Sequence, residues 1–149
     1  MRYILAAAMM LSVIPATMVS AATPCPNAGL RTARVVFETA RGRFPYTLEV
    51  AATSEQQACG MMFRERVAPG TGMSFPMQPP REAGFWMENT LVPLDLIFVS
   101  PAGRVLNVRQ GKPHSREVLS SDGITADVIE LAAGEAQRIG LKPGDRVRR

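Results

Sequence analysis

Polar residues that could bind a ligand surround the single tryptophan of this 149-residue chain. They fall between apolar segments at 85–87 and 94–99. A polar group buried there must be hydrogen-bonded or functional. Trp86 offers a flat apolar face for a sugar or an aromatic ring. Arg64 offers a planar fork of donors for a carboxylate or a pair of hydroxyls. The candidate ligand-binding residues are Arg64, Trp86, Met87, Asn89, Thr90 and Asp95.

The same residues also have a purely structural interpretation. In it, the guanidinium of Arg64 pairs with Asp95 or with Glu88, as buried ion pairs do in small domains. Asn89 and Thr90 then hydrogen-bond the backbone of the turn. The tryptophan is an ordinary core residue in this interpretation, and the polar cluster serves the fold.

Two other classes of function are weighed against a binding protein. An envelope hydrolase acting on saccharide or peptide is the first alternative, and Glu88 and Asp95 are the acid pair that a glycosidase would need. A copper-binding protein is the second, because thioethers suit Cu(I), although methionine is also ordinary core filler. No catalytic residue, metal site or cofactor is predicted, and the balance is against an enzyme.

The first 22 residues have the composition of an export signal. Arg2 supplies the positive start, residues 4–19 are apolar, and Ser20-Ala21-Ala22 provides the small residues that cleavage needs. A retained membrane anchor is the weaker alternative, because a span takes about 20 apolar residues. Cleavage would leave a periplasmic or secreted protein without a membrane span.

The charge balance gives little support to a nucleic-acid partner. The whole chain has 17 basic and 13 acidic residues and a formal net charge of +4. Loss of Arg2 with the signal would leave 16 basic residues and a net charge of +3. These charges are scattered, whereas nucleic-acid binding usually needs a basic face or stripe.

Cys25 and Cys59 are the only cysteines. Two cysteines in an oxidising compartment often pair. A bridge between them would tie down the N-terminal segment and add roughly 3 kcal/mol to stability. Two unpaired thiols are an equally open alternative.

Apolar periodicity predicts a chain made mostly of short strands. The predicted strands span 34–39, 44–50, 83–87, 94–99, 104–109, 124–131 and 146–147. Ser54 and Gln57 have the spacing of a capping box, which predicts a helix over 55–63. A second helix is expected over 135–139, ended by Gly140. Segment 67–80 is rich in Gly and Pro and is predicted to be a loop.

These elements predict a mainly β fold. We expect a compact, mainly antiparallel barrel or sandwich of six or seven short strands with two short helices, and an α+β fold is the alternative. Residues 23–33 form an irregular lead-in, and residues 34–149 form a single domain.

Several motifs then follow one another along the chain. They are Cys59-Gly60-Met61-Met62-Phe63-Arg64, Gly72-Met73-Ser74-Phe75, Phe85-Trp86-Met87-Glu88-Asn89-Thr90, Pro93-Leu94-Asp95-Leu96-Ile97-Phe98 and a closing Gly140-Leu141-Lys142-Pro143-Gly144-Asp145. In this order they resemble the uncharacterised bacterial and archaeal family called domain of unknown function 192. Glu88 stands where that family commonly has a lysine. The resemblance implies a small β-rich fold, often exported, and no established activity.

We therefore expect an exported, monomeric binding module. Its partner would be a small polar ligand or an envelope protein, held by Arg64 and by the turn from Trp86 to Asp95.

Overall fold

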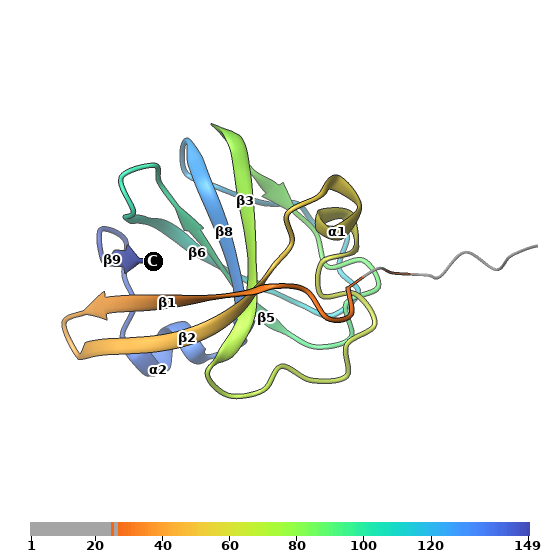
Figure 1. Cartoon of the computed structure of the whole chain (residues 1–149), viewed down its shortest axis with the longest axis horizontal. Coiled ribbons are helices and arrows are strands. Elements are labelled where there is room, and N and C mark those ends of the chain that lie inside the picture. The colour runs from red at the N-terminus through yellow and green to blue at the C-terminus, as the bar shows by residue number, and fades with distance from the viewer. Residues whose placement is uncertain (1–24, 26) are drawn as a thin grey trace, which may run out of the picture.

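The computed structural model describes Cys25 and residues 27–149 (Figure 1), so the predicted export signal lies outside the described residues. The strands are β1 (Thr32–Thr39), β2 (Gly42–Val50), β3 (Thr71–Arg81), β4 (Gly84–Phe85), β5 (Leu94–Val99), β6 (Val105–Gly111), β7 (Leu119–Ser120), β8 (Thr125–Ala132) and β9 (Arg146–Arg148). The helices are α1 (Ser54–Cys59) and α2 (Glu135–Ile139). None of the described helices is long and apolar enough to cross a membrane.

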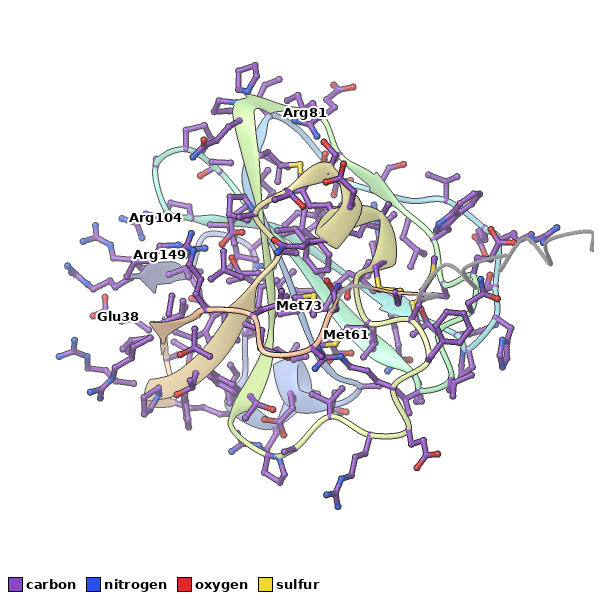
Figure 2. All side chains as sticks on the ribbon, turned by 45° about the vertical axis from the view of Figure 1, so that its right-hand side comes forward. Glu38, Met61, Met73, Arg81, Arg104 and Arg149 are labelled. Atoms are coloured by element: carbon purple, nitrogen blue, oxygen red, sulfur yellow. A yellow bond between two sulfur atoms is a disulfide. The ribbon has the colours of Figure 1, made fainter. Side chains whose placement is uncertain are left out.

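Seven of these strands form one mixed sheet in the order β6-β5-β8-β3-β2-β1-β9, and β4 pairs with β7 separately. β2 and β3 are parallel, and their crossover carries α1, as a parallel pair requires. The mainly β prediction with two short helices is confirmed, but a closed barrel is not supported. Between the two ends of the described sheet there is one isolated bridge, Arg104 to Arg146. Backbone hydrogen bonds from Val105 N to Asp145 O and from Val147 N to Gly103 O, each 2.9 Å, flank it. Arg104, just before β6, and Arg149, just after β9, mark these two ends of the sheet on the left of Figure 2.

The sheet has a hydrophobic core on each face. Consecutive residues of a strand point to opposite faces, so Val128 joins one core and Ile129 the other. α2 covers the Ile129 face with Ala136 and Ile139. The Val128 face is covered by α1 and the turn after it, which contributes Met61. Figure 1 shows the two helices on opposite sides of the sheet.

The predicted loop over 67–80 is wrong, because most of it forms β3, a central strand between β2 and β8. Gly72 is needed for packing, not for a turn. A Cβ there would lie 2.3 Å from the backbone oxygen of Glu130 on the neighbouring strand. The prolines are tolerated because the pairing with β8 shifts register between Pro76 and Arg81.

Helix α1 begins one residue earlier than predicted and ends sooner. The N-cap is Thr53, whose hydroxyl accepts from the amide of Gln56, while the Gln56 side chain accepts from the amide of Thr53. The capping box is therefore real but displaced by one residue from Ser54 and Gln57. The helix stops at Gly60, whose φ of 49° does not continue a helix.

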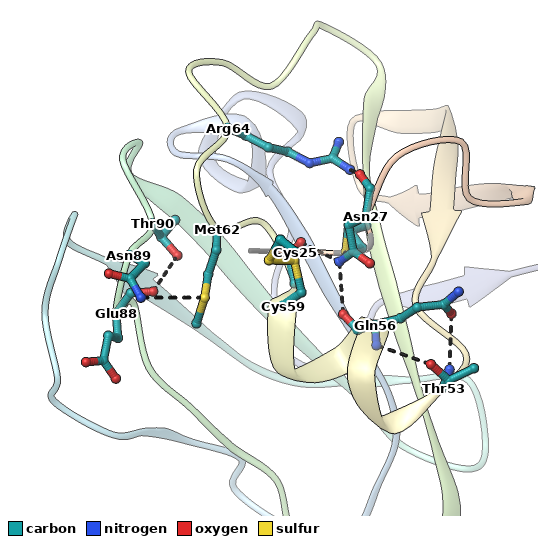
Figure 3. The surroundings of a disulfide bond; sticks show 12 residues. Cys25, Asn27, Thr53, Gln56, Cys59, Met62, Arg64, Glu88, Asn89 and Thr90 are labelled. Atoms are coloured by element: carbon teal, nitrogen blue, oxygen red, sulfur yellow. Dashed lines mark hydrogen bonds between the residues drawn. A yellow bond between two sulfur atoms is a disulfide. The ribbon is translucent and has the colours of Figure 1, made fainter. Parts of the chain in front are cut away.

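The two cysteines form a disulfide between Cys25 and Cys59, with Cα atoms 5.5 Å apart (Figure 3). The bond fastens the lead-in segment to the end of α1. The side-chain amide of Asn27 adds two contacts there, donating to the backbone oxygens of Gln56 and Gly60. Of the residues in these contacts, Cys59 and Gly60 line the site described next.

Candidate functional site

A pocket of about 260 Å³ opens beside α1, a little below the range of about 300–1,000 Å³ that is usual for ligand sites. We call it the α1 pocket. Its walls come from α1 and the turn after it, from β3, and from the chain around β4. The residues that line it are Gln57, Ala58, Cys59, Gly60, Met61, Met62, Phe75, Met77, Arg81, Glu82, Ala83, Gly84, Phe85, Trp86, Thr90 and Glu130.

Glu130 is the buried acidic residue of the α1 pocket. It stands in β8 opposite Met73 on one neighbouring strand and Leu96 on the other, both fully buried. Only 4% of its surface is exposed, and Oε2 has no hydrogen-bond partner among the described residues. Loss of solvent raises the pKa of Glu130 to about 8, and the positive charge of Arg64 opposes this rise. The carboxyl is therefore mostly neutral at pH 7.

Trp86 lines the pocket and is 52% exposed, so it is not the core residue of the structural interpretation. The expected strand over 83–87 is shorter and covers only Gly84–Phe85. Met87 turns inward instead, with a buried side chain packed so closely on Gly111 that a Cβ there would lie 2.4 Å from its Sδ. Because Met87 is anchored inside, the neighbouring indole is directed outward.

Three bulky or polar residues around this turn have left-handed backbone conformations. The φ angles are 62° at Phe63, 56° at Asn89 and 60° at His114. Hydrogen bonds join their segments: the backbone amide of Phe63 donates to Asn89 O at 2.9 Å, and that of His114 donates to O of the next residue, Thr90, at 3.1 Å. Such conformations are costly for non-glycine residues and gather at functional sites. Here they fasten three loops together beside the pocket.

Arg64 has neither of the expected partners. Its guanidinium pairs with Glu49 of β2 and donates to the backbone oxygen of Asn27 at 3.1 Å (Figure 3). Glu88 pairs with Arg116 instead. The expected pairing of Arg64 with Asp95 or Glu88 is wrong, because the disulfide-anchored lead-in brings Asn27 to Arg64.

Asp95 belongs to the opposite face of the sheet from the pocket. In β5 its neighbours Leu94 and Leu96 face the pocket-side core, so Asp95 faces α2. Its carboxylate accepts from the amide of Ala136 at 2.9 Å. Burial raises the pKa of Asp95, and the amides of Ala136 and Gly134 oppose that rise. Asp95 therefore holds the start of α2 in place.

The remaining turn residues make local contacts. Thr90 is buried, and its hydroxyl donates to the backbone oxygen of Glu88 at 3.5 Å. Asn89 is exposed, with its amide 3.9 Å from the sulfur of Met62. Of the six candidate residues, Trp86 and Thr90 line the pocket, whereas Arg64, Met87, Asn89 and Asp95 do not.

Glu130 is not among the site residues predicted from the sequence, although a signal for it exists. Asp127 and Glu130 are the two acids in the apolar run of β8, and period-two alternation places them on opposite faces. Asp127 accepts from Ser74 at 2.9 Å and pairs with Arg149. Glu130 lacks comparable partners, so it is the stronger candidate for a functional role.

The acid pair considered for a glycosidase is also separated by the fold. Glu88 pairs with Arg116, and Asp95 caps α2. Among the described residues, no group of three or more His, Cys, Asp or Glu side chains is arranged to hold a metal ion.

Fold and site together define a small β domain with one mixed seven-stranded sheet. Its pocket lies beside α1, on one face of that sheet. The chain belongs to the family DUF192, described as uncharacterized ACR, whose model matches residues 36–149. This confirms the family inferred from the motifs.

Two solved structures are similar over most of the chain. A protein of unknown function from Novosphingobium aromaticivorans DSM 12444 is 41% identical, with a TM-score of 0.80 over 83% of this chain and 89% of that one. A Sinorhizobium meliloti 1021 protein described as "a putative transcription regulator" is 35% identical, with a TM-score of 0.78 over 81% of this chain and 95% of that one. No curated protein matches this chain.

Proposed function

We propose that this protein binds a small molecule in the α1 pocket, with Glu130 as the polar anchor and Trp86 at the rim. The observation that carries the proposal is the Oε2 atom of Glu130, which is buried at the pocket without a hydrogen-bond partner among the described residues. A buried polar group in that condition costs stability. A ligand group that satisfied it would recover this cost on binding.

The walls of the pocket suit a ligand with an apolar body. Phe75 and Phe85 pack edge to face with ring centroids 5.1 Å apart. The half-exposed indole of Trp86 adds a large rigid surface of the kind that is common at binding sites. The pocket also exposes polar surface, and Gln57, Arg81, Glu82 and Thr90 line it beside Glu130, so the ligand would combine polar contacts with packing on the aromatic rings.

We also propose that the protein works outside the cytoplasm, in the periplasm or after secretion. The disulfide between Cys25 and Cys59 supports this, because such bonds persist in oxidising compartments. The composition of residues 1–22 supports export independently.

The experiment is thermal unfolding of the purified protein against a panel of small molecules. The panel holds envelope sugars, amino acids, dipeptides, nucleotides, organic cations and organic anions. Cu(I) is included because Met61, Met62 and Met77 contribute thioethers to the same pocket. A ligand at 100 times its dissociation constant adds about 2.7 kcal/mol to stability, which is an easily measured shift.

Two variants separate the pocket from the rest of the surface. Trp86→Ala removes the rim and should abolish the shift. Ile124→Ala removes an equally exposed apolar side chain, 52% accessible and outside the pocket, and should preserve it. A panel with no hit would contradict the proposal and favour an envelope protein as the partner. A hit that survives Trp86→Ala would also contradict it, because the compound would then bind outside the α1 pocket.

A further inference from the structure

The chemistry of the α1 pocket also indicates which polar group the ligand carries. Arg64 is the cation whose positive charge acts to lower the pKa of the Glu130 carboxyl. That guanidinium is already paired with Glu49 and bonded to Asn27 O. An ionised Glu130 would therefore be a buried negative charge without its own counter-ion.

The other polar groups of the pocket add no free donor in its interior. The side-chain amide of Gln57 already donates to the backbone oxygens of Ala51 and Pro76. The hydroxyl of Thr90 donates to Glu88 O. At the exposed rim, Arg81 and Glu82 carry charges of opposite sign. Arg81 is the last residue of β3 and is labelled at the top of Figure 2.

The apolar walls favour positive charge as well. Aromatic faces attract cations within about 6 Å, and tryptophan does so most strongly. Trp86 and Phe85 both line the pocket, and Trp86 is half exposed. Thioethers of Met61, Met62 and Met77 supply polarisable surface and no positive charge. Carboxyl, aromatic rings and sulfur together form an acceptor-rich pocket.

We infer that the ligand of the α1 pocket is an organic cation, a primary ammonium or guanidinium group on an apolar body, whose charge pairs with the carboxylate of Glu130. This inference rests on the proposed function. In the complex, the cation supplies the counter-ion that the free protein lacks, and its apolar body packs on Trp86 and Phe85.

The inference has a pH signature. Below about pH 8 the free protein holds a proton on Glu130, and pairing with a cation releases it. Affinity for a cation should therefore rise about tenfold per pH unit from pH 6 to pH 8 and then level off. An alkylammonium keeps its own charge over this range, as lysine does with a pKa of about 10.4. A neutral ligand that accepts from the protonated carboxyl would show the opposite trend above pH 8.

The test is calorimetric titration of the purified protein with three matched probes at pH 6, 7 and 8. The probes are 2-phenylethylammonium, 2-phenylethanol and 3-phenylpropionate. We expect the ammonium to bind at least tenfold more tightly than the other two at pH 8, with about one proton released per ligand at pH 6. Glu130→Gln should lose at least tenfold in ammonium affinity at pH 8, while Glu117→Gln, an exposed carboxyl outside the pocket, should change it by less than twofold.

Several results would overturn the inference, and they differ in what they leave standing. Tighter binding of the alcohol or the carboxylate would refute a cationic ligand and leave the pocket as a binding site. The same conclusion follows if no probe binds but a neutral or anionic compound of the panel binds in a Trp86-dependent way. Failure of the probes and of the whole panel would refute the proposed function too. Ammonium binding that is unchanged in Glu130→Gln would place the cation elsewhere.

Discussion

Replacing Glu130 by glutamine should change how the stability of this protein depends on pH. The carboxyl has an ordinary pKa of 4.5 in the unfolded chain and a pKa of about 8 in the folded protein, because burial removes its solvent. Glutamine has nearly the same shape and stays neutral at every pH. The substitution therefore removes the titration and leaves the packing on Met73 and Leu96 largely in place.

The size of the effect follows from the difference between the two pKa values. Below pH 4.5 the carboxyl is protonated in both states and costs nothing extra. Between pH 4.5 and about 8 the unfolded chain loses the proton while the folded protein keeps it. Stability then falls as pH rises, by about 1.4 kcal/mol per pH unit. The loss reaches about 5 kcal/mol by pH 8 and is constant above it.

Urea unfolding from pH 5 to pH 9 measures this directly. The stability of Glu130→Gln minus that of the wild-type protein should increase by about 4 kcal/mol between pH 5 and pH 8. Glu117→Gln removes a negative charge from an exposed position and should follow the wild-type curve. Parallel curves for Glu130→Gln and the wild-type protein over this range would refute a buried, unpaired carboxyl.

Other contacts give further predictions, each measured as the free energy of unfolding. Replacing both Cys25 and Cys59 by alanine opens a loop with a sequence separation of 34, and the chain-entropy model gives a loss of about 3–4 kcal/mol. Reduction of the wild-type protein should reproduce this loss, and an unchanged unfolding midpoint in either case would contradict the model. Thr53→Ala removes the N-cap of α1 and should cost about 1 kcal/mol. Ser54→Ala, at the N-cap position predicted from the sequence, should cost clearly less. Asp95→Ala leaves the amide of Ala136 unpaired and should cost about 1–3 kcal/mol; a neutral result would show that α2 does not depend on this bond.

Elements with local patterns could be predicted from the sequence. The strand over 94–99 and the helix over 135–139 have the predicted bounds, because an apolar run and a C-terminal glycine define them locally. β3 was missed because its composition is typical of a loop. Gly72 is required by the neighbouring strand β8, and that requirement arises only when the sheet is assembled.

The candidate site was harder to predict for the same reason. Asp127 and Glu130 cannot be told apart by sequence pattern, because both are single acids within the same apolar strand. Asp127 has a counter-ion only because the last residue, Arg149, folds back onto it. Arg64 likewise pairs with Glu49 of β2, and not with an acid of the turn from Trp86 to Asp95 as the motif predicted. Which buried charge lacks a partner is decided by tertiary contacts, and periodicity carries no information about them.

The most direct test of a binding pocket with an unpaired acid is the titration of the Glu130 carboxyl itself. Carbon-13 NMR of the side-chain carboxyl, assigned by its absence in Glu130→Gln, would follow the group from pH 4 to pH 10. We predict a midpoint near pH 8 in the free protein, moving to lower pH when a cation that binds the pocket is added. A midpoint near the ordinary value of 4.5 would contradict the account, since it would show that the protein already compensates the charge of Glu130 without a ligand.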